Sequence, residues 1–398
     1  MSELEQVKAR LADEVERRAE VLVDVSHQIH AHPEENFEEH FAHDLLTDVI
    51  AGDGLTVTRK AYGVDTAFEA KAGSDGPTIA VLCEYDSLPG IGHACGHNVI
   101  AAAGLGAGLA AAALAEELGG RVVILGTPAE EGGGGKVRLI DAGAFADIDA
   151  AMMVHPADSD LTAMEVIAVQ QVIATYRGEA AHAAAFPHRG RNALDALILG
   201  YMNVAALRQH IAPGERIHGV VTHGGDKPNI VPAFAQSQWM VRSPTLSRLA
   251  RLKERFTACL EGGAQAAGCS VELEWIDPTY ADMIDNRAIV DLYQANAEVL
   301  GRQVVEPATG GKVVGSTDMG NVSYVVPSIH PMIRVAPPGV PIHTPEFATY
   351  AGGDAGDQAV VDGAKAMAWT VADLWLDEDL LTTARTEWEA SVERRTNR

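Results

Sequence analysis

The sequence TIAVLCEYDSLPGIGHACGHN, residues 78–98, joins a short apolar run to a polar loop that contains several glycines. Residues 78–82 predict a buried strand, because a short uninterrupted apolar run fits a strand that is covered on both faces. Residues 98–118 consist mostly of Ala and Gly and predict a buried helix. The apolar run 121–125 predicts the next strand, and strand, helix and strand in this order are typical of an α/β sheet with crossover connections.

The flanking segments continue this alternation. Further helices are predicted at residues 3–30, 38–50 and 136–144, and a third buried strand at 150–154. The same domain resumes near residue 280 and ends in helices after Ala355. We therefore expect an α/β domain with a mixed sheet, formed by residues 1–167 and 279–398.

The pattern changes between these two segments. Strands are predicted at 166–176, 217–223, 235–242 and 270–275, and helices at 192–211 and 246–267. The resulting order βαββαβ is that of a compact, ferredoxin-like α+β domain. We expect residues 168–278 to form this inserted domain, with hinges at its two ends that let it act as a lid over the first domain.

The composition limits the classes of partner. The chain has 398 residues, with 30 Lys and Arg against 55 Asp and Glu, so its formal charge is −25. Such a surface repels phosphate backbones and anionic lipids, and we expect neither nucleic acid nor a membrane as a partner. The charged N-terminus does not resemble a signal peptide, and four cysteines are too few for a disulfide framework, so we expect a cytoplasmic protein.

Potential metal ligands follow the predicted strands. Ligands in open α/β sheets collect at the carboxyl ends of the strands. Cys95 and His97 follow the first strand, Glu130 and Glu131 the second, and His155 the third. Thiolate, imidazole and carboxylate together suit zinc and similar divalent cations.

Each of these pairs also has a simpler interpretation. Cys95 and His97 could be a buried cysteine beside a capping histidine, and Glu130 with Glu131 could form a solvated acidic turn. His155 could be a core histidine. Taken together, and with His343 near the C-terminus, the donors are sufficient for two metal ions and leave one glutamate as a base.

In order along the chain, the sequence resembles the dinuclear metallopeptidase family that includes aminoacylases, glutamate carboxypeptidases and hippurate hydrolases. The matching motifs are residues 29–34, the turn at Asp86, and residues 95–97, 128–132, 154–156, 178–184, 229–232, 315–318 and 343–345. The family usually has an aspartate between the two metals, where this chain has Cys95. This substitution resembles the cysteine-containing branch of the family. The motifs EYDSLPG, CGHN and GSTDMGNVS resemble aminobenzoyl-glutamate hydrolases and β-alanyl-dipeptidase-like members.

The resemblance implies a role for each residue of the metal site. The expected ligands of two divalent cations per subunit are Cys95, His97, Glu131, His155 and His343. The cations would be zinc or manganese, with cobalt and nickel as alternatives. Glu130 would be the general base, and Asp86 would orient a metal-bound imidazole.

The resemblance also implies roles for residues of the insert. His182 would reach across the interface of a homodimer, formed through the insert, and help to bind the oxyanion at the partner's site. Asn229 and Arg242 would bind the substrate carboxylate. A surface or core position for His182, and a surface ion pair for Arg242, are the alternatives.

The implied activity is metal-dependent hydrolysis of an amide bond in an N-acyl amino acid or a dipeptide-like substrate. One alternative is a catalytically inactive metal-binding oligomer. The other is a hydrolase that uses Cys95 as its nucleophile. His97 lies only two residues away and is poorly placed to activate Cys95, and this route would leave the other donors without a role.

Overall fold

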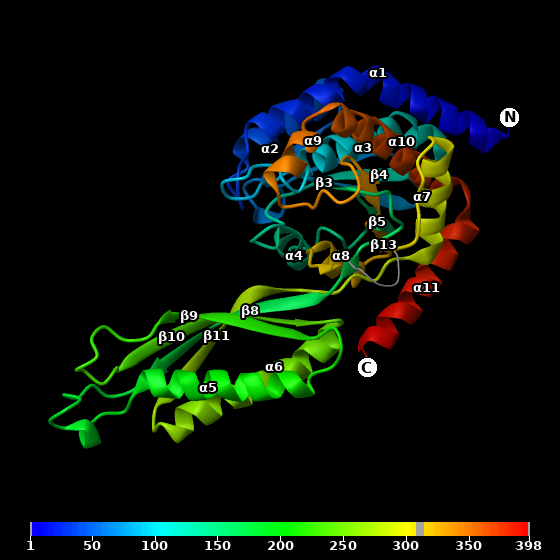
Figure 1. The fold of residues 1–398 in the computed structure, drawn as a ribbon. Helices are drawn as coiled ribbons and strands as arrows, with labels where there is room; N and C mark the ends of the chain where they lie inside the picture. The colour runs from blue at the N-terminus through cyan, green and yellow to red at the C-terminus, as the bar shows by residue number, and fades with distance from the viewer. Residues whose placement is uncertain (1, 308–313, 397–398) are drawn as a thin grey trace. The chain divides into compact units, whose positions relative to one another are not determined.

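The computed structural model describes residues 2–307 and 314–396 (Figure 1). The chain divides into two compact units. The first contains Met1–Glu165 and Met283–Glu393, and the second contains Val166–Asp282 with Arg394–Arg398. The predicted insert, residues 168–278, falls within the second unit, and its role as a lid or dimerisation domain stays a prediction.

A six-stranded sheet forms the centre of the first unit, in the order β1-β2-β4-β3-β5-β13. Its strands are β1 (Val57–Arg59), β2 (Phe68–Ala72), β3 (Thr78–Glu84), β4 (Arg121–Thr127), β5 (Ala150–Met152) and β13 (Ser328–Ile329). Strands β4, β3, β5 and β13 are parallel, whereas β2 is antiparallel to both β1 and β4. The mixed sheet predicted from the sequence is confirmed.

Helices surround this sheet (Figure 1). They are α1 (Glu3–Ala31), α2 (His40–Gly52), α3 (His97–Leu118), α4 (Gly135–Asp141), α7 (Arg287–Val299), α8 (Met319–Ser323), α9 (Pro345–Ala351), α10 (Asp354–Leu376) and α11 (Glu378–Thr396), with the 3-10 turn η1 (Ala61–Gly63). Helix α1 begins with a capping box, in which Ser2 and Glu5 satisfy each other's backbone N–H groups. Helices α1, α3 and α10 pack against one another, and α3 also packs on β3 and β4.

Helix α3 lies in the core of the first unit. Among the described residues it is the one helix whose length and composition would allow it to cross a membrane, but 89% of its apolar window is buried in the protein. Its glycines allow close packing: a Cβ atom on Gly104 would lie 2.4 Å from the carbonyl oxygen of Leu82 in β3. A Cβ atom on Gly108 would lie 2.4 Å from the side chain of Ile124 in β4. The buried helix predicted for this segment is confirmed.

Several predicted elements have different ends in the structure, and two of them have a clear physical reason. The third strand was predicted to run to residue 154, but β5 ends at Met152 and His155 begins a separate short strand, β6 (His155–Ala157). Strand β6 pairs in parallel with β14 (Met332–Arg334), so long-range pairing decides where it starts. Helix α4 ends at Asp141, because Gly143 takes a left-handed conformation.

The second unit is a four-stranded antiparallel sheet in the order β11-β8-β10-β9. Its strands are β8 (Ala168–Arg177), β9 (Arg216–His223), β10 (Phe234–Ser243) and β11 (Ser270–Tyr280); its helices are α5 (Ala193–Leu207) and α6 (Leu246–Ala266), with turns η2 (Pro187–Arg189) and η3 (Arg208–His210). Alternate residues of β8 and β10 are buried against the two helices, around Trp239 and Phe256. The short strands β7 (Glu165–Val166) and β12 (Val314–Gly315) complete the described elements.

Replacing Gly104 with alanine tests the close packing of α3. The new Cβ atom would collide with the Leu82 carbonyl, and because this oxygen belongs to a sheet strand it cannot move away easily. We expect Gly104→Ala to lower the free energy of unfolding by about 1–3 kcal/mol or more, measured by chemical denaturation. Gly52 ends α2 with nothing within 4 Å of its Cβ position, so Gly52→Ala is the control and should be neutral or stabilising. Equal stabilities of the two variants would contradict the packing.

Candidate metal centre

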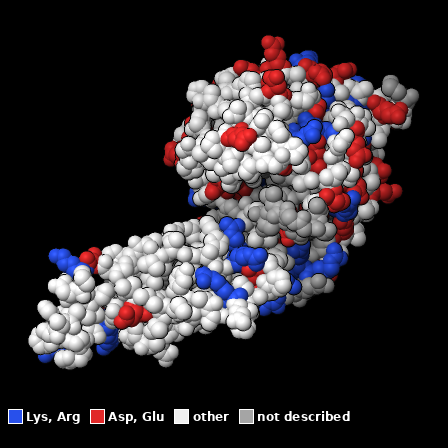
Figure 2. Space-filling view, viewed as in Figure 1, with Lys and Arg blue, Asp and Glu red and all other residues white. Residues whose placement is uncertain are grey.

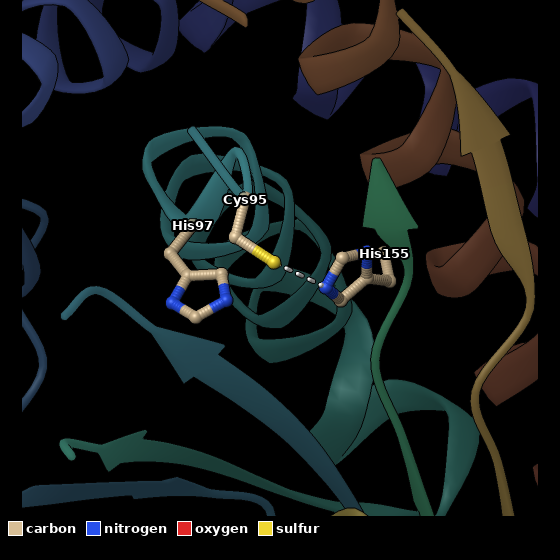
Figure 3. Close-up of side chains that lie close together, drawn as sticks. All are labelled: Cys95, His97 and His155. Carbon is tan, nitrogen blue, oxygen red and sulfur yellow. Dashed lines mark hydrogen bonds between the residues drawn. The ribbon is translucent and has the colours of Figure 1, made fainter. Parts of the chain in front are cut away.

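Four segments of the first unit bring the predicted metal ligands together. Cys95 lies in the loop that precedes α3, and His97 is the first residue of that helix. His155 begins β6, and its Nε2 lies 3.4 Å from the Cys95 Sγ atom (Figure 3). Gly96 makes this approach possible, because it has a φ of +80° and its Cβ position would be 2.8 Å from the ring of Pro156. The first group of donors is therefore Cys95, His97 and His155.

A second group of donors shares the same sulfur. Cys95, Glu131 and His343 have ligand atoms that all lie within 4.8 Å of one another. The Glu131 Oε1 atom is 3.3 Å from the His343 Nε2 atom. Glu131 lies in the loop after β4, and His343 lies just before α9. The structure thus brings all five predicted metal ligands to one place, with Cys95 in both groups.

The donors in these groups fit divalent cations. Two ligands on one tetrahedral zinc ion, each about 2.0–2.3 Å from it, lie roughly 3.3–3.6 Å apart. The Cys95–His155 and Glu131–His343 separations of 3.4 Å and 3.3 Å are close to that value. Among the described residues, the buried His97 Nε2 and Glu131 Oε1 atoms have no hydrogen-bond partner. Buried polar atoms are rarely left without a partner, so these atoms are suited to hold a cation.

Asp86 holds two parts of the centre in place. The His97 Nδ1 atom donates to Asp86 Oδ1 at 3.1 Å, and the Glu131 N–H donates to Asp86 Oδ2 at 2.8 Å. Burial by itself would raise the pKa of Asp86, but His97 and the Glu131 amide together hold that pKa below its ordinary value. An ionised Asp86 fixes the His97 ring so that Nε2 is the nitrogen left for a ligand.

Glu130 has the surroundings of a proton carrier. It is buried, and one of its carboxylate oxygens lies within 4.8 Å of ligand atoms of Glu84 and His97. Burial, with the charges of Glu84 and Glu131, raises the pKa of Glu130 well above its ordinary value. By contrast, burial would raise the pKa of the neighbouring Glu131, but His343 and His97 together hold it below its ordinary value. The two adjacent carboxyl groups therefore have pKa values shifted in opposite directions.

Two loops of the centre contain a residue other than glycine in the left-handed backbone conformation. One loop carries Glu130 and Glu131, and the other carries His343. Ala129 has a φ of +59°, and His343 has a φ of +64°. The Ala129 N–H donates to the buried Glu39 carboxylate at 2.9 Å, and the His343 N–H donates to the Ala94 carbonyl at 2.8 Å. Such conformations persist where the surrounding contacts fix them, often at functional sites.

Four further residues of the centre, Glu84, Lys136, Asp318 and His330, were missed as site residues by the sequence analysis. The buried Lys136 side chain forms ion pairs with Glu84 and with Asp318, the latter at 2.6 Å. Asp318 lies in a motif of the family resemblance, and Lys136 is a charged residue directly after a glycine run. Neither signal indicates that the two side chains meet, because 182 positions separate them. His330 also lies here, with its ring 5.2 Å from the His155 ring, and nothing in its sequence context marks it.

The three predicted site residues of the insert lie in the second unit. His182 and Asn229 are exposed and close together: the Ala183 N–H donates to the Asn229 carbonyl, and His182 forms a bridge with Ile230. Arg242 lies near the other end of β10, eight positions after Phe234. At about 3.4 Å per residue this separation is about 27 Å, so one copy of the second unit does not bring Arg242 to His182.

Comparisons with known proteins identify the family of the chain. The model of Peptidase family M20/M25/M40 matches residues 76–371. The Xaa-Arg dipeptidase of Mus musculus is 38% identical over 98% of this chain and 94% of its own length. One of the polypeptides of the p-aminobenzoyl-glutamate hydrolase of Escherichia coli is 29% identical over 96% of this chain and 95% of its own length.

A solved structure shows the same fold. A dinuclear metal binding peptidase from the M20 family of Bacillus subtilis has a TM-score of 0.70 and 18% identity, covering 90% of this chain and 99% of that one. On the family match and the long similarity to the mouse enzyme, this chain belongs to peptidase family M20/M25/M40.

Proposed function

We propose that this chain uses two divalent cations, held by Cys95, His97, Glu131, His155 and His343, to hydrolyse the amide bond of dipeptides or N-acyl amino acids. Membership of the M20 family and the relatives named as dipeptidase and hydrolase support metal-dependent amide hydrolysis. The observation that carries the proposal is the shared position of Cys95 in two donor groups, with the carboxyl of Glu130 close by.

The residues of the chain divide the chemistry among them. When bound, two divalent cations supply Lewis acidity, which acidifies a water molecule and polarises the amide carbonyl. The Glu130 carboxylate takes a proton from the attacking water and delivers it to the leaving amine nitrogen. Its raised pKa suits both halves of this transfer. Asp86 keeps its hydrogen bond to His97 Nδ1 throughout and so keeps the ring in one orientation.

The donor set limits the choice of metal. One thiolate and three imidazoles suit zinc, cobalt and nickel, whereas carboxylates also suit manganese. We propose zinc or manganese, with cobalt and nickel as alternatives that metal analysis of the purified protein distinguishes.

We propose a substrate with a basic C-terminal residue, of the Xaa-Arg type. The similarity to the mouse enzyme of that name over nearly the full chain supports it. The net charge of −25 also favours the encounter with a cationic substrate over an anionic one such as aminobenzoyl-glutamate.

We also propose a homodimer that forms through the second unit. Seven large apolar residues are exposed there: Phe186, Ile198, Leu199, Met202, Val220, Val221 and Ile230. Three of them lie on α5, and two lie on β9, which is an edge strand of its sheet. Uncharged side chains cover most of the side of the second unit seen in Figure 2. A second copy would cover this apolar surface and pair with the free edge.

The cysteines and the surface charge bear on the cell compartment and on the partners of the protein. All four cysteines are free, which supports a reducing compartment, and we propose the cytoplasm. The acidic surface supports small-molecule substrates rather than nucleic acid or membrane lipids as partners.

A cysteine nucleophile is the second candidate, because Cys95 contacts His155. Burial and the charge of Glu131 raise the pKa of the Cys95 thiol well above its ordinary value. A reactive nucleophile needs the opposite shift, so we favour Cys95 as a metal ligand.

Replacing Glu130 with glutamine removes the proposed proton carrier and leaves its size nearly unchanged. We expect Glu130→Gln to bind both cations and to lower kcat by about 10²–10⁴-fold. Metal content by plasma emission spectrometry and steady-state kinetics would measure the two effects. Glu131→Gln is the comparison, and it should lose metal. A Glu130→Gln enzyme with kcat near the wild-type value would show that another group carries the proton.

Removal of the metal tests the class of mechanism and the substrate together. A chelator should abolish hydrolysis, and added zinc or manganese should restore it. The restored enzyme should cleave alanyl-arginine with a kcat/KM about tenfold or more above that for aminobenzoyl-glutamate. Turnover that resists the chelator but is stopped by a thiol reagent would instead support the cysteine nucleophile. A preference for aminobenzoyl-glutamate would reject the basic substrate alone.

A charge on α5 tests the homodimer. Met202 is 59% exposed, and an aspartate there would be buried without a partner in the proposed interface. We expect Met202→Asp to weaken dimerisation by about 30-fold or more in sedimentation velocity experiments. Val299, which is 76% exposed at the end of α7 in the first unit, provides the control variant Val299→Asp. A Met202→Asp protein that dimerises like the control would exclude this face.

A further inference from the structure

Glu84 and Lys136 lie within the metal centre without a role in the mechanism described above. Both side chains are buried, and the Lys136 ammonium is paired on one side with Glu84 Oε2 and on the other with Asp318 Oδ1. Replacing buried ion pairs with apolar residues is often neutral or stabilising, so such a cluster is weak evidence for a purely structural role.

The second oxygen of Glu84 points to a function. Glu84 Oε1 lies 3.2 Å from the His97 Nε2 atom, and this contact is an ion-pair distance that does not meet the geometry of a hydrogen bond. When Asp86 accepts the Nδ1 proton of His97, Nε2 is the nitrogen with a lone pair for a metal. A lone pair and a carboxylate oxygen repel each other at this distance unless a proton or a metal ion lies between them.

The separation also matches that of two ligands on one ion. Oxygen and nitrogen ligands at about 2.0–2.2 Å from a zinc ion lie roughly 3.3–3.5 Å apart in a tetrahedron, and closer together at higher coordination. Glu84, His97 and Glu130 form a third group of donors whose ligand atoms lie within 4.8 Å of one another. His97 belongs to this group and also to the group of Cys95 and His155.

Lys136 is held rigidly enough to orient Glu84. It is the second residue of α4, and its N–H donates to Asp318 Oδ2 at 2.8 Å, so Asp318 binds both the backbone and the side chain of Lys136. A Cβ atom on the preceding Gly135 would lie 1.8 Å from the Pro128 carbonyl oxygen, so the start of α4 is pressed against the chain that leaves β4. The Lys136 ammonium therefore has one position available.

The charges explain why a lysine is needed beside a metal. Glu84, Asp86, Glu130 and Asp318 would carry four negative charges near the ligands Cys95 and Glu131 if all of them were ionised. Burial raises the pKa of Glu84 and that of Asp318, and the Lys136 ammonium between them counteracts part of this effect in both. Because the Lys136 ammonium binds Glu84 Oε2, the other oxygen, Oε1, faces His97.

We propose that Glu84 is a sixth ligand of the metal centre, on the cation held by His97, and that Lys136 is the positioning residue that presents it, anchored by Asp318. This inference rests on the proposed function, because it requires that two cations bind. It assigns Glu84 to one of the two sites only.

In the deciding experiment, the chelator-stripped protein is titrated with zinc or with manganese, and calorimetry measures the number of ions bound and their affinities. The wild type should bind two ions. Glu84→Gln keeps the size of the side chain and leaves Lys136 paired with Asp318, so it should fold. We expect it to bind one ion like the wild type and the other about 100-fold more weakly or worse.

The matched control is Glu69→Gln. Glu69 lies in β2, is 13% exposed and pairs with Lys71, so this variant also removes a partly buried, ion-paired carboxylate of the first unit. It should bind both ions with wild-type affinity. X-ray absorption of the zinc-loaded proteins provides a second readout, in which Glu84→Gln alone should lose part of the oxygen and nitrogen shell.

The positioning role of Lys136 has its own variant. Lys136→Met should weaken the same ion by about 10–100-fold, whereas Lys8→Met, which removes the ion pair with Asp373, should leave both affinities unchanged. If Lys136→Met does not fold, Glu84→Gln decides the proposal alone. A Glu84→Gln protein that binds both ions like the wild type overturns the inference and leaves the proposed function standing. A wild-type protein that does not bind two ions overturns both.

Discussion

The position of the Cys95 sulfur is the constraint on which the metal centre depends. This atom belongs to one group of donors with His97 and His155, and to a second with Glu131 and His343. The Cys95 sulfur can belong to both groups only if the four chain segments that carry the five donors come together around it. The parallel strands β3, β4 and β5 make this possible, because their carboxyl ends lie at one edge of the sheet and the ligand loops leave from that edge.

The packing of α3 maintains this arrangement. Cys95 and His97 are positioned by the start of the helix, and the helix is positioned by its contacts with β3 and β4. Glycine at positions 104 and 108 brings the helix axis close to both strands. A helix of larger residues would lie farther from the sheet, and the sulfur would then move away from His155. The glycines of α3 therefore help to set the positions of Cys95 and His97.

Much of this could be predicted from the sequence, because the signals are local. Apolar runs and Ala-rich segments determine β3, α3 and β4, and motifs after the predicted strands contain four of the five predicted ligands, with His343 in a separate motif near the C-terminus. The start of β6 at His155 could not be predicted, because it depends on pairing with β14, nearly 180 residues further along the chain. The cluster of Glu84, Lys136 and Asp318 was missed for the same reason. Glu84 and Asp318 lie in motifs of the resemblance, but nothing local indicates that they meet Lys136, and only the fold brings the three charges together.

The left-handed backbone at Ala129 and His343 has a consequence for how the centre handles its ions. An L-residue in this conformation is about 1–2 kcal/mol less stable than in the right-handed region, and here hydrogen bonds to Glu39 and Ala94 maintain it. Neither hydrogen bond uses a donor atom of the five predicted ligands, so the backbone of both loops is fixed by contacts other than those to a cation. Two divalent cations that suit the same donors would therefore meet the same backbone, and the choice between them would depend on the chemistry of the donor atoms.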